Sequence, residues 1–204
     1  MGSLQGALPR ALVSSLDFRF IFANSSPLVI LSFRLKAEAA KERQMDEKAL
    51  FLQFWEKEAP ATRKVISRIP EGSEYRPDPK SRTAREIAWL IVREEILLTE
   101  GLEKGTLEWK EVPAPATAKE VLDTYDKNHD ALTKKLKALA PANLERKVPF
   151  MFDGQEVMSD TGYANAWGFF FDIIHHRGQL STYLRPMGAK VPQIYGPSAD
   201  EPMM

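Results

Sequence analysis

The strongest chemical signal in this sequence is an aspartate and a histidine four residues apart. Asp172 and His176 lie in residues 167–185, a long apolar stretch interrupted by a few polar groups. If the stretch is helical, residues four apart lie on adjacent turns of one side, so the carboxylate and the imidazole can bind a single metal ion. The alternative is an Asp–His hydrogen bond or ion pair without metal, because two ligands fall short of the four that zinc usually takes.

Gln179 and Tyr183 extend the same polar stripe, three and seven residues after His176. A polar group that points into an apolar core needs a hydrogen bond, a metal ion or a cavity, so the stripe predicts a pocket. His175 lies about 100° further round the helix. We count it with the pocket residues, in a packing contact or facing solvent, and not with the ligands. His129 lies among charged and polar neighbours and is interpreted as part of a solvated face.

Composition excludes several classes of function. The 204 residues contain no cysteine, so disulfides, thiol nucleophiles and cysteine-bound metals are excluded, and any metal must have nitrogen and oxygen ligands. The formal net charge is zero, which leaves no electrostatic footprint for nucleic acid or an anionic membrane. We therefore expect a cytoplasmic protein whose partner is a small-molecule substrate or ligand, with no nucleic acid and no membrane.

The first 44 residues differ from the rest. Residues 20–33 are apolar but too few to cross a hydrocarbon layer of about 30 Å, and they fit a signal peptide poorly. Met45 directly precedes a well-patterned helix. We expect Met45 to be the natural start, with residues 1–44 as a poorly ordered N-terminal extension or leader and residues 45–204 as the folded domain.

Four long amphipathic segments without alternating strands predict an all-α four-helix bundle. In chain order these are residues 46–68, 83–101, 117–141 and 159–188. Pro60 predicts a kink or restart in the first. The longest connection, residues 142–159, precedes the last helix and is expected to cross the mouth of the bundle, and residues 191–197 are expected to be extended and to pack back on it.

Local signals set the expected helix ends. Thr83 and Glu86 have the spacing of a capping box, as do Thr117 and Glu120. Gly101 is predicted to be the C-cap of the second helix.

Three further ends and contacts are expected around the last helix. Ser159 or Asp160 is predicted to cap its start, and Gly188 to end it. Arg177 and Arg185 are expected to pair with carboxylates on neighbouring elements.

A long ordered motif follows the two adjacent histidines. It comprises HHRGQL at residues 175–180, YLR at 183–185, Gly188, VP at 191–192 and YGPSAD at 195–200. This motif resembles the C-terminal signature of the DinB-like superfamily, and the helix layout from Met45 to Glu201 agrees with it. The resemblance implies a four-helix bundle with a divalent metal ion, commonly nickel, zinc or iron, held by three histidines, and a homodimer in many members. Characterised relatives include S-transferases and isomerases that use low-molecular-weight thiols.

Carried onto this chain, the resemblance preserves one of the three histidines. The last falls on His176, the one four residues earlier falls on Asp172, and the one on the second helix falls at about Leu90. An aspartate can replace an imidazole as an oxygen ligand, whereas leucine cannot bind a metal. The site implied by the resemblance is therefore remodelled.

Two outcomes follow from this remodelling. In the first, Glu94, one turn beyond Leu90 on the same face, completes a Glu94, Asp172 and His176 site for zinc, nickel, iron or manganese, and the harder oxygen ligands favour iron, manganese or zinc. Gln179 would then orient a ligand or contact substrate, and the protein would be a metal-dependent hydrolase or thiol S-transferase relative. In the second, the site is degenerate. Arg93 or another cation pairs with Asp172, His176 bonds Asp172, and the fold serves as a non-enzymatic small-molecule-binding or stress-associated scaffold.

Overall fold

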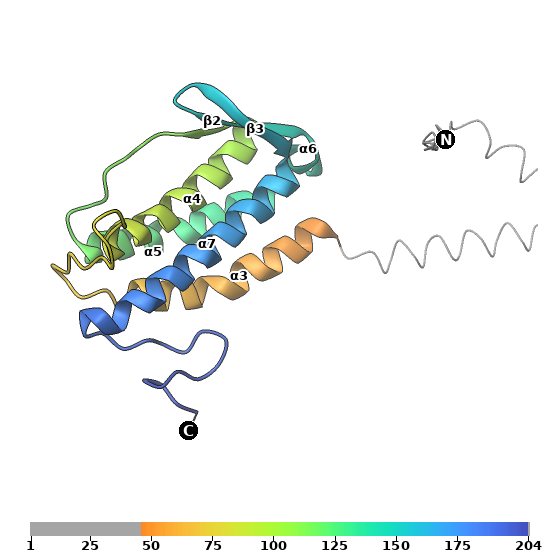
Figure 1. Ribbon diagram of the computed structural model, residues 1–204. Helices are drawn as coiled ribbons and strands as arrows, with labels where there is room; N and C mark the ends of the chain where they lie inside the picture. The colour runs from red at the N-terminus through yellow and green to blue at the C-terminus, as the bar shows by residue number, and fades with distance from the viewer. Residues whose placement is uncertain (1–45, 204) are drawn as a thin grey trace, which may run out of the picture. The chain divides into compact units, whose positions relative to one another are not determined.

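The computed structural model describes residues 46–203, and four long helices make up more than half of these residues (Figure 1). These helices are α3 (Glu47–Ile66), α4 (Ala84–Lys104), α5 (Ala118–Ala138) and α7 (Gly162–Leu184). The shorter elements are β1 (Leu107–Trp109), α6 (Pro141–Glu145), β2 (Lys147–Phe152), β3 (Gln155–Thr161) and the 3-10 turn η1 (Arg185–Met187). Helices α3 and α4 each pack against both α5 and α7. The expectation for residues 1–44 lies outside the described part of the chain.

Both predicted capping boxes are confirmed. At the start of α4 the Thr83 hydroxyl accepts a hydrogen bond from the backbone N–H of Glu86 (3.3 Å), and the Glu86 carboxylate accepts one from the backbone N–H of Thr83 (2.7 Å). Thr117 and Glu120 form the same pair at the start of α5. Each box satisfies amides that the first turn of a helix leaves without partners.

The predicted end of α4 at Gly101 is wrong. The helix continues for one more turn to a C-cap at Gly105, whose φ of 95° lies in the left-handed region that glycine tolerates. Gly101 is buried inside the helix, where a side chain would collide with Leu107 of β1. Glycine at this position therefore allows β1 to pack closely against α4, and it does not cap the helix.

At Pro60 the sequence predicted a kink or a restart. Helix α3 runs through this residue, so the predicted restart is wrong, and the kink stays a prediction. Proline removes one backbone donor, but the carbonyls of the preceding residues receive hydrogen bonds from neighbouring helices. Arg177 donates to the Glu58 carbonyl (3.2 Å) and Tyr125 to the Ala59 carbonyl (3.3 Å). These contacts from α7 and α5 stabilise the segment around Pro60.

The connection before α7 contradicts the all-α prediction. Its two strands, β2 and β3, join β1, which follows α4, in a three-stranded sheet of order β1-β2-β3, with β1 parallel to β2 and β2 antiparallel to β3. Asp153 and Gly154 join β2 to β3 with φ values of 48° and 75°, the two positive values of a type I′ hairpin turn. β3 is mostly exposed and carries little hydrophobic alternation, so its residues lack the pattern that predicts a strand.

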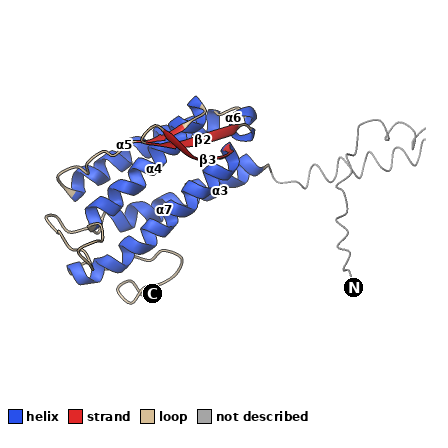
Figure 2. Cartoon of the chain, turned by 45° about the horizontal axis from the view of Figure 1, so that its top comes forward, coloured by secondary structure: helices blue, strands red, loops and turns tan. Residues whose placement is uncertain are grey.

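The sheet lies beside the C-terminal end of α4 and the N-terminal end of α7 (Figures 1 and 2). The predicted cap of α7 at Ser159 or Asp160 is wrong. The cap is Thr161, the last residue of β3, whose hydroxyl accepts a hydrogen bond from the backbone N–H of Ala164 (3.1 Å). The helix ends at Leu184, and η1 then leads to Gly188 with a φ of 77°, close to the predicted stop.

A buried ion pair joins α7 to α3. Arg177 is 2% exposed, and its guanidinium lies 2.7 Å from the Glu58 carboxylate. Tyr195 of the tail donates to the same carboxylate (2.8 Å) and accepts from Arg177 (2.5 Å). The expectation that Arg177 pairs with a carboxylate is confirmed, as is that for Arg185, which pairs with Asp200 at 2.9 Å near the surface.

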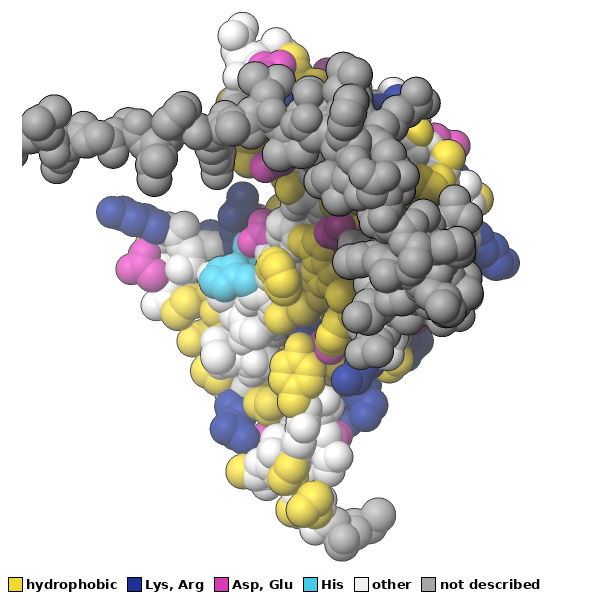
Figure 3. Space-filling view, turned by 90° about the vertical axis from the view of Figure 1, so that its right-hand side faces the viewer, with side chains coloured by type: hydrophobic (Ala, Val, Ile, Leu, Met, Phe, Trp, Pro, Cys, Tyr) yellow, Lys and Arg dark blue, Asp and Glu magenta, His cyan; other side chains and the backbone are white. Residues whose placement is uncertain are grey.

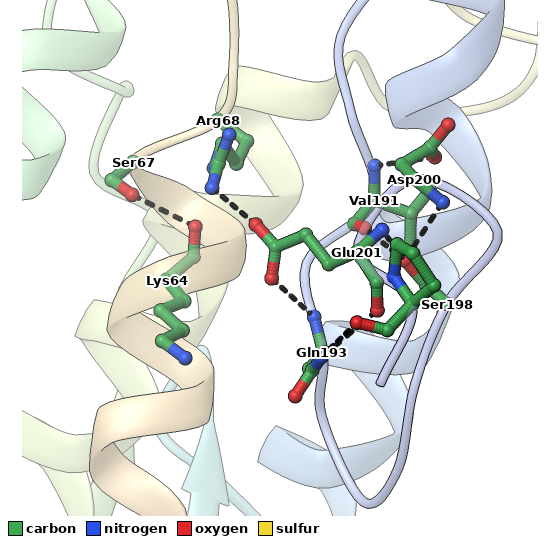
Figure 4. A network of polar contacts seen from close by, with 9 residues as sticks. Lys64, Ser67, Arg68, Val191, Gln193, Ser198, Asp200 and Glu201 are labelled. Atoms are coloured by element: carbon green, nitrogen blue, oxygen red, sulfur yellow. Dashed lines mark hydrogen bonds and ion pairs between the residues drawn. The ribbon is translucent and has the colours of Figure 1, made fainter. Parts of the chain in front are cut away.

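The C-terminal tail packs back on the helices, as predicted (Figure 4). The Asp200 and Glu201 carboxylates accept hydrogen bonds from the backbone of Val191 and Gln193, both at 2.9 Å. Glu201 also pairs with Arg68, just beyond the end of α3, at 2.5 Å. The tail is thus closed on itself and tied to the domain.

Some large hydrophobic side chains stay at the surface of the described residues, among them Phe54 of α3 and Phe171 of α7. Figure 3 shows hydrophobic side chains gathered on one face of the domain. None of the described helices has the length and apolarity that crossing a bilayer requires.

Replacing Arg177 with methionine should lower the free energy of unfolding by about 3–5 kcal/mol, because it leaves the Glu58 carboxylate buried without its cation. Urea denaturation measures this change. The matched control, Arg185→Met, breaks an exposed pair and should cost less than about 1 kcal/mol. Equal losses in the two variants would contradict the role given to the buried pair.

Candidate metal centre

Helices α4 and α7 bring the three predicted ligands together. Glu94 comes from α4, and Asp172 and His176 come from adjacent turns of α7. One ligand atom of each lies within 4.8 Å of the other two, and the Nε2 atom of His176 is 3.5 Å from both Glu94 Oε1 and Asp172 Oδ1. The Glu94 side chain is 3% exposed, that of His176 is 15% exposed and that of Asp172 is 51% exposed. The cluster is therefore buried at Glu94 and open to solvent at Asp172.

This spacing fits a metal ion. Two ligands about 2.1 Å from one ion at the tetrahedral angle lie about 3.4 Å apart, close to the two separations from His176. The second carboxylate oxygen of Glu94, Oε2, is buried and has no hydrogen-bond partner among the described residues. An unpaired buried carboxylate oxygen is unfavourable, and a cation would satisfy it.

Gln179 orients the imidazole. Its Oε1 lies 3.0 Å from Nδ1 of His176, one turn further along α7. When Nδ1 carries the proton and donates to Gln179, the lone pair of Nε2 faces the two carboxylates. Metal-binding histidines commonly have such a partner on the other ring nitrogen, which sets the tautomer.

Burial and charge shift the protonation of the cluster. Burial raises the pKa of Glu94 to about 7, although the hydrogen bond with His176 opposes the shift. Burial lowers the pKa of His176, but hydrogen bonds with Glu94 and Gln179 and the nearby carboxylates outweigh it, so the net shift is upward. Near neutral pH the pair therefore holds protons that a metal ion would displace.

The remaining predicted pocket residues lie in different surroundings. Leu90 lines a cavity of about 640 Å³ beside the three ligands. Tyr183 is buried with its ring against Tyr75, and it lines a smaller cavity of about 200 Å³ together with His176 and Gln179. His175 is exposed and is not among the residues that line the larger cavity. Their roles stay predictions.

The larger cavity has walls that sequence reasoning missed. The hairpin supplies Phe150, Phe152 and Met158, β1 supplies Trp109, and α7 supplies Phe169. The alternation of apolar residues before the Asp153-Gly154 turn was the available signal for this hairpin. A cavity with apolar walls and some polar groups, here including the three ligands, is typical of a small-molecule site.

Arg93 does not pair with Asp172, contrary to the second outcome considered from the sequence. Its Nη2 donates to the carbonyl of Lys110 (3.1 Å), and its guanidinium lies 5.9 Å from the centre of the Trp109 ring. Its contacts with Trp109 of β1 and with Lys110 therefore hold the Arg93 side chain away from α7. Among the described residues, the group within ion-pair distance of Asp172 is the His176 imidazole at 3.5 Å, the Asp–His contact that the second outcome also expected.

The solvated face predicted around His129 is wrong. Its side chain is 13% exposed, and Nδ1 lies 3.1 Å from both carboxylate oxygens of Glu95. The ring is stacked on Trp55 and Tyr125, with centroid distances of 5.6 and 5.3 Å. The histidine thus neutralises a buried glutamate and takes no part in the three-ligand cluster.

Comparisons with known proteins agree on one family. The sequence matches the DinB family over residues 45–203. It is 28% identical over 158 residues to the uncharacterized protein YrdA of Bacillus subtilis, covering 74% of this chain and 89% of that protein.

Two solved structures share the fold. A DinB-like protein of Bacillus subtilis, YjoA, superposes with a TM-score of 0.57 at 18% identity, covering 71% of this chain and 97% of its own. A DinB-like protein of Bacillus cereus ATCC 10987 also has a TM-score of 0.57, at 23% identity and 71% and 95% coverage.

The raised pKa of Glu94 predicts a pH-dependent stability in metal-free protein. Its pKa is about 7 in the folded state against 4.5 for an unperturbed glutamate, so its contribution is fully present below pH 4.5 and is lost as the pH rises through about 7. Glu94→Gln removes this dependence. Relative to the native protein, the variant should gain roughly 2–3 kcal/mol in unfolding free energy between about pH 5 and about pH 8.

Urea denaturation of chelator-treated protein across this pH range measures the gain. Glu103→Gln is the control, because this glutamate lies on the same helix but is exposed. A constant difference between Glu94→Gln and the native protein at all pH values would show that Glu94 is not buried in the way described.

Proposed function

The chain belongs to the DinB family, and from that premise we propose that Glu94, Asp172 and His176 bind one divalent transition-metal ion. The observation that carries the proposal is the Glu94 carboxylate, which is 3% exposed and has one oxygen without a partner in the described part of the chain. From the same family membership we also propose that the four long helices form a four-helix bundle of the DinB type. The small sheet is then an addition at one end of the bundle.

The donor set favours particular metals. One imidazole and two carboxylates form a harder set than three imidazoles, which favours iron, manganese or zinc over nickel. Three protein ligands leave coordination positions open, as in catalytic metal sites. When bound, such an ion would polarise a substrate or activate water for attack.

The chain's own residues would prepare the site for this chemistry. Gln179 holds the His176 ring in one orientation, and the buried position of Glu94 fixes one ligand on the rigid α4 helix. The apolar cavity lies directly beside the ligands and would hold the substrate away from water. On this basis the protein is a metal-dependent hydrolase or thiol S-transferase relative that acts on a small molecule.

A second candidate is a non-enzymatic small-molecule-binding or stress-associated scaffold with a degenerate metal site. It is favoured by Leu90, which occupies the place of a family histidine, and by the exposure of Asp172, which is 51%. A cytoplasmic location, a homodimer, the absence of a nucleic-acid partner and an N-terminal extension at residues 1–44 stay predictions in either case.

Protein purified without chelators should contain about one transition-metal ion per chain, measured by elemental analysis. Adding the metal to chelated protein should raise the melting temperature, because a ligand that binds only the native state stabilises it by about 2.7 kcal/mol at a hundred times its Kd.

Asp172→Ala and His176→Ala should each abolish the bound metal, and His175→Ala is the matched control that should retain it. Less than about a tenth of an equivalent of metal, with no thermal shift from zinc, nickel, manganese or iron, would reject the metal site and favour the scaffold. Metal retained by His176→Ala would show that the ligands are assigned to the wrong face.

A further inference from the structure

Three cavities beside the metal centre share a single arginine. We name the 640 Å³ cavity the apolar cavity, a cavity of about 450 Å³ the basic cleft, and the 200 Å³ cavity the small cavity. Arg82 lines all three. The apolar cavity and the basic cleft also share Leu90, Trp109 and Glu111, so they are adjacent at this wall.

The basic cleft has an excess of positive charge. Its positively charged residues are Arg76, Lys80, Arg82 and Arg93, and its negatively charged residues are Glu86 and Glu111. The Glu86 carboxylate is already used by the capping box of α4. The whole chain has no net charge, so this excess is local. Such a cleft attracts an anionic group.

Arg82 is held in place at its backbone but free at its side chain. It directly precedes Thr83, the N-cap whose backbone and hydroxyl are both bonded to Glu86. The Arg82 side chain is exposed, and no described carboxylate forms an ion pair with it. It is also the only lysine or arginine among the described residues that line the apolar cavity, where His176 lies too.

We propose that the ligand of this site is an organic oxyanion with an apolar body. Its carboxylate, phosphate or sulfonate binds Arg82 at the entrance to the basic cleft, and its aromatic or aliphatic part lies in the apolar cavity against Phe150 and Phe169. This inference rests on the proposed function, since it names the substrate class of the same site.

The chemistry of the two regions supports this division. A guanidinium presents several N–H donors in a planar fork that matches an oxyanion, and it keeps its charge at every physiological pH. Aromatic walls stabilise an apolar body by removing its surface from water. A neutral apolar ligand would gain nothing from the Arg82 guanidinium, and a small polar anion would gain nothing from the aromatic walls.

A pair of fluorescent probes with the same aromatic body tests the inference. Anilinonaphthalene sulfonate carries one oxyanion, and N-phenyl-naphthylamine is its uncharged counterpart. The native full chain should bind the sulfonate more tightly. Arg82→Gln should weaken sulfonate binding by about tenfold, the effect expected for losing one charged hydrogen bond, and leave the neutral probe unchanged.

Three further variants complete the design. Arg82→Lys retains the charge and should recover part of the sulfonate affinity. Lys127→Gln removes an exposed positive charge on α5 that lines none of the three cavities, and should change neither probe. Phe169→Ala should weaken both probes, because it removes a wall of the apolar cavity.

The inference is overturned by equal affinity of the native protein for both probes. It is also overturned if Arg82→Gln behaves like Lys127→Gln, or weakens both probes equally. The titrations are made on chelator-treated and on metal-loaded protein. Absence of metal binding would reject the proposed function while probe discrimination by Arg82 still held, so the two failures are distinguishable.

Discussion

Folding of this domain buries three glutamates, and the cost of removing their charge from water shapes the site. Glu58, Glu94 and Glu95 are 8%, 3% and 4% exposed. Arg177 pairs with Glu58, and His129 lies equally close to both oxygens of Glu95. Glu94 has only a long contact to His176, and its second oxygen has no partner among the described residues. Because buried carboxylates need a cation or a proton, Glu94 is the place where this fold is incomplete by itself.

The incompleteness lies at the contact between α4 and α7. These helices pack directly, and α7 carries two further polar side chains, Asp172 and His176, toward the same point. The charge of a metal ion would offset the cost of burying the Glu94 carboxylate. Without a metal ion, a proton on Glu94 lowers that cost instead, as the raised pKa of Glu94 indicates. Glu94 thus links the stability of the folded domain to the binding of a metal ion.

The small sheet converts this polar cluster into a pocket. Its strands add aromatic walls beyond the ends of the helices and draw Arg93 onto Trp109, away from Asp172. The loop before α4 places Arg82 where the apolar cavity meets the basic cleft. The helices therefore position the ligands, and the added strands and loop decide what molecule fits beside them.

The sequence by itself determined the four long helices and two of the three residues of the candidate metal centre. Hydrophobic periodicity and two capping boxes are local, so the starts of α4 and α5 were predictable, and spacing of four placed Asp172 with His176 on one side of α7. Gly101 and His129 were misinterpreted, because their roles depend on Leu107 and on Glu95, and α3 passes through Pro60 without the predicted restart. Only the tertiary structure decided that Glu94 faces α7, that the connection forms a sheet and that Arg82 adjoins the cavity. These facts depend on how separate elements rotate and pack against one another, and no local periodicity encodes that.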